Sequence, residues 1–203
     1  MSGIYIVVLE SWVDETRKMA EAHGIDKAKG VIAGGGSALD SIYLGLKQMV
    51  ADRLPSDTIV EIHDGVRPII TESMIRANAE ATVLHGNAIT CIPAFETMAL
   101  CKSGSLHVEH VVDRKRAYTL QAPQTFRLGE AYAINARAQD EQTVGQFVDQ
   151  ANMHDYYGVP LRLIEGIRGN VKITIPDDVS YFTYLVESGE YARMIGVLPE
   201  VAR

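Results

Sequence analysis

The chain has 203 residues and a formal net charge of −7 at pH 7, because 26 Asp and Glu outnumber 19 Lys and Arg. Such a surface excludes a general attraction to nucleic acids or acidic membranes and leaves room only for a local basic pocket. Hydrophobic residues make up 47% and charged residues 22%, which is ordinary globular usage and excludes a disordered chain.

The sequence shows no pattern typical of a membrane span, a secretory signal peptide or a cysteine motif. No apolar run approaches the length of about 20 residues that spans a bilayer. The opening letters MSGIYIVVLESW lack the basic start of a secretory signal peptide. The two cysteines, Cys91 and Cys101, stand in no CxxC or His-paired pattern. The sequence therefore predicts a cytoplasmic protein with reduced thiols and no membrane partner.

Strand and helix signals alternate along the first half of the chain. Short apolar runs predict strands, and apolar residues at helical spacing predict helices between them. The expected strands are residues 4–9, 31–33, 59–62 and 88–93, and the expected helices are 12–23, 38–50 and roughly 71–85. This order is typical of an α/β protein with a mostly parallel sheet flanked by helices.

The pattern changes after Pro93. Residues 94–121 alternate in polarity around a Ser103-Gly104 turn, which predicts an antiparallel β-arm. Further expected elements are helices at roughly 127–138 and 144–157, strands at 161–164 and 171–174, and a final helix starting at Pro176. No linker divides the chain, so we expect one domain over residues 1–203, with a protruding arm at about 94–121.

A glycine run follows the second predicted strand. Gly34, Gly35 and Gly36 precede Ser37, and Ser41 lies inside the next helix. Without Cβ atoms, three glycines allow backbone N–H groups to approach an anion or a base edge. The alternative is a tight strand-to-helix turn with no ligand, and the run matches neither a Walker loop nor GxGxxG.

The third predicted strand ends in His63-Asp64-Gly65-Val66-Arg67-Pro68. Ligands collect at the carboxyl ends of strands in such sheets, so Asp64 would face the crevice and hold Mg²⁺ or a ribose hydroxyl. Arg67 would offer a planar donor group to a phosphate. The alternative is an Asp64–Arg67 ion pair that only closes the turn.

Two more cationic positions stand out in this acidic chain. Arg114 belongs to the run VDRKR at 112–116 on the arm, which is either a phosphate site or a solvated charged turn. Lys172 lies in a predicted strand of apolar residues, so its ammonium must face solvent or a crevice. Lysine is a common point-charge ligand for phosphate.

Several separated segments together resemble one family, the 2-C-methyl-D-erythritol 4-phosphate cytidylyltransferases, with the ribitol-5-phosphate cytidylyltransferases as close relatives. The matching segments, in family order, are GGGSALDSIYLGL (34–46), HDGVRP (63–68), ETM (96–98), VVDR (111–114), QAPQTF (121–126), and EG followed by NVKIT. The resemblance implies a Rossmann-like nucleotidyltransferase that uses CTP and Mg²⁺ and forms a homodimer. A polyol phosphate oxygen would attack the α-phosphorus of CTP, giving a CDP-alcohol and pyrophosphate.

On the nucleotide side, the resemblance implies that Gly34, Gly35, Gly36 and Ser41 bind CTP. Asp64 would bind the metal and the ribose region. Asp64 is therefore expected both as the Mg²⁺ ligand and as a catalytic residue.

On the acceptor side, the resemblance implies phosphate binding by Arg67 and Lys172. Thr97 and Arg114 match positions on an arm that reaches into the partner subunit and binds the acceptor phosphate there. Asp149, in VDQA, matches a further acceptor position. Lys172 and Arg114 join Asp64 as expected catalytic residues.

The chain also departs from the family pattern. It starts after the position of the family's glycine-rich loop with its catalytic lysine, so this chain alone is expected to turn over slowly or not at all. Ala38 stands where the family has an arginine, and Glu96 stands as the acid of the arm's DT pair. The acceptor stays open between methylerythritol phosphate, for non-mevalonate isoprenoid synthesis, and ribitol 5-phosphate, for cell-wall polymers. A third hypothesis is a non-catalytic dimeric homologue.

Overall fold

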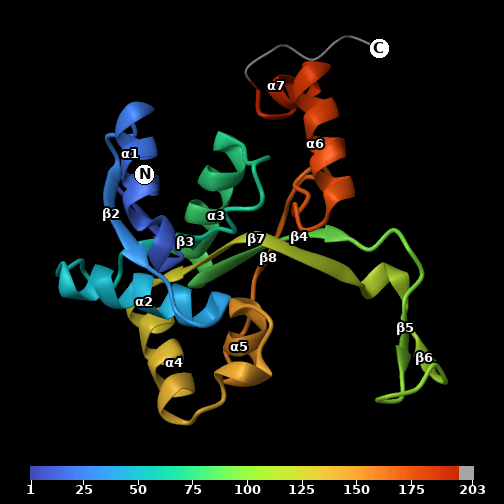
Figure 1. Ribbon diagram of the computed structural model, residues 1–203. Helices are drawn as coiled ribbons and strands as arrows, with labels where there is room; N and C mark the ends of the chain where they lie inside the picture. Colours follow the sequence, from blue (N-terminus) through green and yellow to red (C-terminus); the bar gives the residue numbers. More distant parts are fainter. Residues whose placement is uncertain (197–203) are drawn as a thin grey trace. The chain divides into compact units, whose positions relative to one another are not determined.

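Most of the elements predicted from the sequence are present in the structure, a computed structural model that describes residues 1–196 (Figure 1). The elements in chain order are β1 (Ile4–Val8), η1 (Glu10–Trp12), α1 (Val13–Ala22), β2 (Ala28–Ala33), α2 (Ala38–Ala51), β3 (Ile59–Ile62), α3 (Glu72–His85), β4 (Asn87–Pro93), β5 (Ala99–Cys101), β6 (Val108–Val111), η2 (Arg114–Arg116), β7 (Tyr118–Arg127), α4 (Leu128–Asp140), η3 (Val144–Gln146), α5 (Gln150–Tyr156), β8 (Leu163–Glu165), α6 (Pro176–Glu187) and α7 (Glu190–Met194). The predicted α/β class is confirmed.

The chain forms two compact units. The first comprises Met1–Val60 with Phe126–Leu161, and the second comprises Glu61–Thr125 with Arg162–Arg203. The chain passes between the units within β3, near the end of β7 and just before β8. The expectation of a single domain stays a prediction.

In the first unit, the β-branched run of β1 pairs in parallel with β2, with Val8 opposite Ala33. Helix α2 packs on β1 and on α4. It begins where expected because the Ser37 hydroxyl accepts a hydrogen bond from the backbone N–H of Asp40 at 3.1 Å, the usual N-cap arrangement. The core of this unit gathers Leu39, Ala138, Phe147 and Met153.

The second unit carries most of a four-stranded sheet with the order β3-β7-β4-β8. Strands β4 and β8 are parallel, with Ile89 opposite Leu163, and α3 packs on both. Helix α3 begins one residue after its predicted start, because the Thr71 hydroxyl caps it by accepting from the N–H of Met74 at 3.1 Å. The predicted antiparallel arm is present as β5 and β6, which extend away from the sheet of this unit (Figure 1).

Three expectations about elements were wrong. Residues 118–121, assigned to the arm, begin the ten-residue strand β7, because buried polar partners stabilise a Gln- and Pro-containing segment that has weak strand propensity. Residues 171–174 form no strand; their backbone donates instead from Val171 N–H to Gly169 O at 2.7 Å and from Ile173 N–H to Val66 O at 2.8 Å. The helix expected at 144–157 divides into η3 and α5, because Asp149 is extended and caps α5.

No helix within residues 1–196 combines the length and the apolar character that crossing a membrane requires.

Candidate active site

Three charged side chains meet after the end of β3. Asp64 Oδ2 accepts from Arg67 Nε at 3.1 Å and also lies 3.3 Å from Lys172 Nζ. The Arg67 side chain is 13% exposed, whereas Asp64 and Lys172 keep 39% and 48% of their side-chain surface. Sequence analysis selected all three residues, and the structure brings them together within the second unit.

Two cations on one carboxylate oxygen leave this cluster with a net positive charge. The alternative interpretation, an ion pair that closes the turn, needs only Asp64 and Arg67. Lys172 comes from the other end of the sequence, and its ammonium adds a second charge that the turn does not require. A half-exposed cationic group around one carboxylate suits the binding of phosphate oxygens.

A buried asparagine fixes the position of Arg67. Arg67 Nη1 donates to the backbone oxygen of Asn170 at 2.7 Å. The Asn170 side chain is fully buried, and its Nδ2 donates to Ala122 O of β7 at 2.6 Å. Gln121 Nε2 also donates to Asn170 O, at 3.3 Å. The loop before Lys172 is therefore tied to a strand of the sheet.

His63 supports the same turn. Its Nε2 donates to Arg67 O at 2.9 Å, because a carbonyl can only accept, and its Nδ1 is buried without a partner within the described chain. His63 therefore supports the backbone of this turn. In residues 1–196, no group of three or more His, Cys, Asp and Glu side chains could hold a metal ion.

One carboxylate oxygen of Asp64 is nevertheless suited to bind Mg²⁺. Oδ2 is shared by Arg67 and Lys172, while Oδ1 accepts no hydrogen bond from the residues that the structure describes. Mg²⁺ often binds through one or two carboxylates and completes its shell with water and substrate phosphates. Asp64 could supply that one carboxylate oxygen.

The glycine run in the first unit is packed against α2. A Cβ on Gly34 would lie 2.6 Å from Ser41 Oγ, and one on Gly35 would lie 2.5 Å from Asp40 Cβ. The N–H of Gly34 donates to Val8 O at 2.6 Å, and that of Gly35 donates to Ser41 Oγ at 3.1 Å. Close packing in the turn therefore explains Gly34 and Gly35, and it engages the Ser41 hydroxyl.

Gly36 differs from its two neighbours. A Cβ there would meet only Asp40 Oδ2, at 3.7 Å, and its N–H makes no hydrogen bond within the described residues. Of the three predicted nucleotide-binding glycines, Gly36 therefore keeps a backbone donor for a ligand.

The remaining predicted residues lie elsewhere. Asp149 caps α5, where its Oδ1 accepts from the N–H of Asn152 at 2.7 Å, so its helix-capping role accounts for this carboxylate. Thr97 is exposed just before β5. Arg114 is exposed in η2, and its Nη1 donates to Phe95 O at 3.3 Å. The roles of all the predicted site residues stay predictions.

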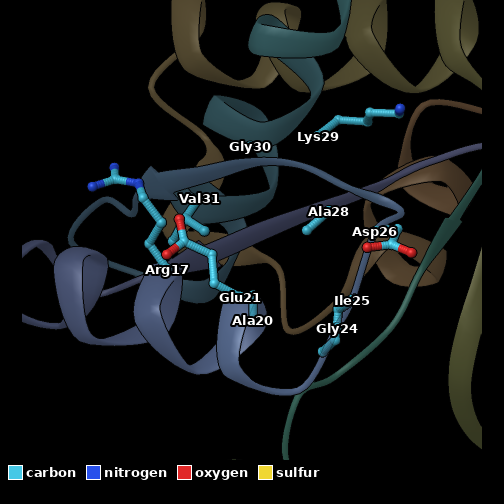
Figure 2. Close-up of a pocket in the computed structure, with 10 residues that line it drawn as sticks. All are labelled: Arg17, Ala20, Glu21, Gly24, Ile25, Asp26, Ala28, Lys29, Gly30 and Val31. Atoms are coloured by element: carbon cyan, nitrogen blue, oxygen red, sulfur yellow. The ribbon is translucent and has the colours of Figure 1, made fainter.

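A separate hollow of about 330 Å³ lies between α1 and β2 in the first unit (Figure 2). Figure 2 shows Arg17 and Glu21 side by side on α1, with Asp26 and Lys29 farther along the lining. Both signs of charge are present, and none of the predicted site residues lines this hollow.

Sequence reasoning missed the supporting residues. Asn170 and Gln121 have polar side chains whose burial depends on carbonyl groups distant in the sequence, and Asn170 is 103 positions from Arg67. The family motifs NVKIT and QAPQTF contain Asn170 and Gln121 and were the available signals. Arg168, whose guanidinium lies over Phe95, had no signal of its own.

The fold and the cluster define an α/β protein with a cationic group of side chains after a strand end, an arrangement that suits phosphate ligands. The sequence profile of the family described as IspD, 2-C-methyl-D-erythritol 4-phosphate cytidylyltransferase, matches residues 1–188. The chain belongs to this family. The resemblance seen in the motifs is therefore confirmed, as is the expected class, the nucleotidyltransferases.

Relatives of two kinds are similar to the chain. The ribitol-5-phosphate cytidylyltransferase of Vibrio parahaemolyticus is 34% identical over 196 residues, covering 97% of this chain and 81% of the relative. The 2-C-methyl-D-erythritol 4-phosphate cytidylyltransferase of Geobacter metallireducens is 33% identical over 181 residues, covering 88% and 75%.

Two solved structures show the same fold. The 2-C-methyl-D-erythritol 4-phosphate cytidylyltransferase of Francisella tularensis matches with a TM-score of 0.75 at 24% identity, covering 91% of this chain and 80% of that one. The 4-diphosphocytidyl-2C-methyl-D-erythritol synthase of Anaerococcus prevotii matches with a TM-score of 0.78 at 21% identity, covering 92% and 79%.

Proposed function

We propose that this chain transfers the cytidylyl group of CTP to a polyol phosphate. An oxygen of the acceptor phosphate attacks the α-phosphorus, and a new P–O bond forms. The bond from the α-phosphorus to the oxygen bridging to the β-phosphorus breaks, and pyrophosphate leaves. The observation that carries the proposal is the cluster of Asp64, Arg67 and Lys172, in a chain of this family.

The chemistry asks the protein mainly to hold two anionic substrates in line and to balance their charge. Arg67 is largely buried and anchored on Asn170, so its guanidinium presents its remaining donors in a fixed direction. Lys172 is half exposed and offers a mobile point charge. Together they would bind phosphate oxygens, while Gly36 offers a backbone N–H to the nucleotide.

Mg²⁺ is part of the proposal. When bound, it would neutralise charge on the triphosphate of CTP. Asp64 would hold it through Oδ1, while the bonds of Oδ2 to Arg67 and Lys172 keep the carboxylate oriented.

Two acceptors remain candidates. The family profile and the Geobacter metallireducens relative favour 2-C-methyl-D-erythritol 4-phosphate, whose product would enter isoprenoid synthesis. Ribitol 5-phosphate is the second candidate, because a ribitol-5-phosphate cytidylyltransferase matches 97% of this chain.

A homodimer through the arm belongs to the same proposal. The two arm strands expose several apolar side chains to solvent, among them Leu100 at 59%, Val108 at 56% and Val111 at 55%. Burial of these side chains against a second copy would stabilise a dimer and would deliver Thr97 and Arg114 to the partner's acceptor site. A mass that stays monomeric at every concentration in light scattering would contradict this part. A cytoplasmic location stays a prediction.

The test of function combines substrate binding with pyrophosphate release. Pyrophosphate is measured with CTP, Mg²⁺ and each of the two acceptors, and release with either one supports transfer. By calorimetry, Arg67→Ala and Lys172→Ala should each weaken binding of the polyol phosphate by about 1.5–3 kcal/mol, the range for hydrogen bonds to charged groups. Arg76→Ala is the control, since Arg76 is exposed on α3 and pairs with Glu72.

Asp64→Asn tests the metal, because the amide removes the negative charge at nearly constant shape. CTP affinity should fall in this variant and in EDTA. Equal CTP affinity in all these conditions would remove Asp64 from the site. Binding of CTP without pyrophosphate release from either acceptor would overturn the transfer proposal in favour of a non-catalytic homologue.

A further inference from the structure

The side-chain amide of Gln121 joins strand β7 to both ends of one tight turn, residues 167–170. Its Nε2 carries two N–H groups and lies 3.3 Å from Ile167 O and 3.3 Å from Asn170 O. These two carbonyls begin and end the turn, which the N–H of Asn170 closes by donating to Ile167 O at 3.1 Å. Gln121 is buried, so its amide holds the turn from inside the second unit.

The same turn leads into the cations of the candidate site. Asn170 O accepts from Arg67 Nη1 at 2.7 Å in addition to the glutamine amide. Lys172 follows two residues later. The next residue, Ile173, donates from its N–H to Val66 O at 2.8 Å, in the turn that carries Arg67. Lys172 therefore stands between a residue that the amide holds and a residue bonded to the turn of Arg67.

The two carbonyls do not depend on this amide for a hydrogen bond. Without it, Ile167 O keeps the N–H of Asn170, and Asn170 O keeps Arg67. At 3.3 Å, both bonds of the amide are longer than the usual range of about 2.7–3.2 Å. Gln121 Oε1 is buried without a partner in residues 1–196. An apolar side chain of the same shape should therefore be about as stable at this position.

Glycine at position 166 leaves room for the amide. A Cβ on Gly166 would lie 2.7 Å from Gln121 Oε1 and 2.6 Å from Thr90 Cγ2. The N–H of Gly166 donates to Cys91 O at 2.7 Å, which fixes the start of the loop on β4. The reverse orientation of the amide would place Oε1 against two other acceptors, the carbonyls of the turn. The loop after β8 is thus built around one orientation of the Gln121 side chain.

We propose that Gln121 is a positioning residue of the phosphate-binding site. Its amide holds the turn on β7 so that Asn170 O keeps the Arg67 guanidinium in its direction and Lys172 stays close to the same carboxylate. This role explains why the chain buries an amide that stability does not require. The inference rests on the proposed function, because the ligand is the polyol phosphate that Arg67 and Lys172 would bind.

Loss of the amide would loosen the turn without unfolding it. The Asn170 side chain would still link the turn to β7, because its Nδ2 donates to Ala122 O at 2.6 Å. A link at one point allows the turn to rotate about it, and such a rotation displaces Asn170 O together with the chain that leads to Lys172. Arg67 and Lys172 would then reach one phosphate less well, and small misplacements of this kind weaken binding and catalysis.

The variant for the test is Gln121→Met, which removes both N–H groups and keeps an unbranched side chain of similar volume. Calorimetry is carried out with 2-C-methyl-D-erythritol 4-phosphate and with ribitol 5-phosphate. The dissociation constant of the acceptor that the unaltered chain binds should rise about three- to tenfold, less than in Arg67→Ala, which loses the direct contact. The urea midpoint of Gln121→Met should stay close to that of the unaltered chain.

Gln150→Met, in the first unit, is the matched control and should give the opposite result. Gln150 is also buried, but its Nε2 donates to Asn135 Oδ1 at 3.0 Å and its Oε1 accepts from Asn135 Nδ2 at 2.7 Å. Removing this amide leaves Asn135 Oδ1 buried without that donor, so the urea midpoint should fall. The affinity of the folded variant for the polyol phosphate should not change.

A double-mutant cycle asks whether Gln121 acts through Arg67. Gln121→Met should raise the dissociation constant by a smaller factor in Arg67→Ala than in the unaltered chain, because the guanidinium that it positions is absent. Factors that multiply independently would refute the coupling between the two residues.

The outcomes that overturn the inference are distinct from failure of the proposed function. Unchanged polyol phosphate affinity in Gln121→Met, beside weakened binding in Arg67→Ala, refutes the positioning role and leaves the proposed function standing. A urea midpoint that falls as far in Gln121→Met as in Gln150→Met also refutes it, because the amide then serves stability. If the unaltered chain binds neither polyol phosphate, both proposals fail.

Discussion

Acid should destabilise the first unit through one buried histidine. The imidazole of His154, on α5, has no exposed surface and stacks on the ring of Phe126, with the centroids 3.8 Å apart. Its Nδ1 donates to Gln150 O at 2.7 Å, while Nε2 is buried without a partner within the described residues. A proton on Nε2 would place an unpaired charge in an apolar site.

Burial therefore lowers the pKa of His154 from 6.5 to about 4, although the hydrogen bond to Gln150 opposes the shift. As the pH falls, the unfolded chain takes up this proton first, near pH 6.5. The stability from the neutral ring is complete above about pH 6.5 and is lost as the pH falls toward about 4. The total loss is about 3 kcal/mol, at about 1.4 kcal/mol per pH unit.

The variant for this test is His154→Asn. An asparagine amide can donate to the carbonyl four residues earlier, as Asn78 does to Met74 O at 2.9 Å and Asn135 does to Ala131 O at 2.8 Å. The variant loses the ring stack and is less stable at neutral pH, but its side chain does not titrate. The difference in unfolding free energy between the unaltered chain and His154→Asn should therefore shrink by about 3 kcal/mol between pH 6.5 and 4.

Urea unfolding measures this difference, followed by the fluorescence of Trp12, which belongs to the same unit as His154. His23→Asn is the matched control, because His23 is exposed at the end of α1 in that unit. Stability curves of the unaltered chain and His154→Asn that run parallel from pH 7.5 to 4 would refute this explanation.

Three further predictions concern stability and thiol chemistry. Asn170→Ala should lower the free energy of unfolding by about 1–3 kcal/mol, because it leaves the buried carbonyl of Ala122 without its donor, and a urea midpoint equal to that of the unaltered chain would contradict this. Ser37→Ala should cost about 1 kcal/mol through loss of the α2 cap, whereas Ser37→Asp, which can still cap, should cost less in the same urea assay. Maleimide should label the exposed Cys101 much faster than the buried Cys91. Burial and a nearby carboxylate raise the pKa of the Cys91 thiol, so little reactive thiolate is present there. Equal labelling rates by mass spectrometry would contradict this and show that the core around Cys91 opens readily.

Local signals in the sequence were sufficient for much of the fold. Strand β3 was predicted at its observed bounds, since a short apolar run ends at His63-Asp64-Gly65. Helices α2, α3 and α6 begin at or within a residue of their predicted starts, because Ser37, Thr71 and Pro176 act on the backbone within their own first turn. Such interactions span only a few residues, so the sequence alone reveals them.

The sequence also supplied the charged residues of the candidate site. Asp64 and Arg67 stand three positions apart, and their ion pair was one of the two interpretations offered. The contribution of Lys172 to the same carboxylate followed from no local pattern, and the strand expected around Lys172 does not form.

Only the tertiary structure decided how that site is supported. Arg67 is anchored by Asn170, 103 positions away, and the Phe95 ring is covered by Arg168 from another loop. Strand β7 was missed because the burial of Gln121 becomes favourable only when the carbonyl groups of a distant loop accept its hydrogen bonds. The sequence by itself therefore determined most of the strands, the starts of several helices and the family motifs. The folded chain determined which polar groups satisfy one another, because a buried polar side chain is stable only beside a partner that sequence distance conceals.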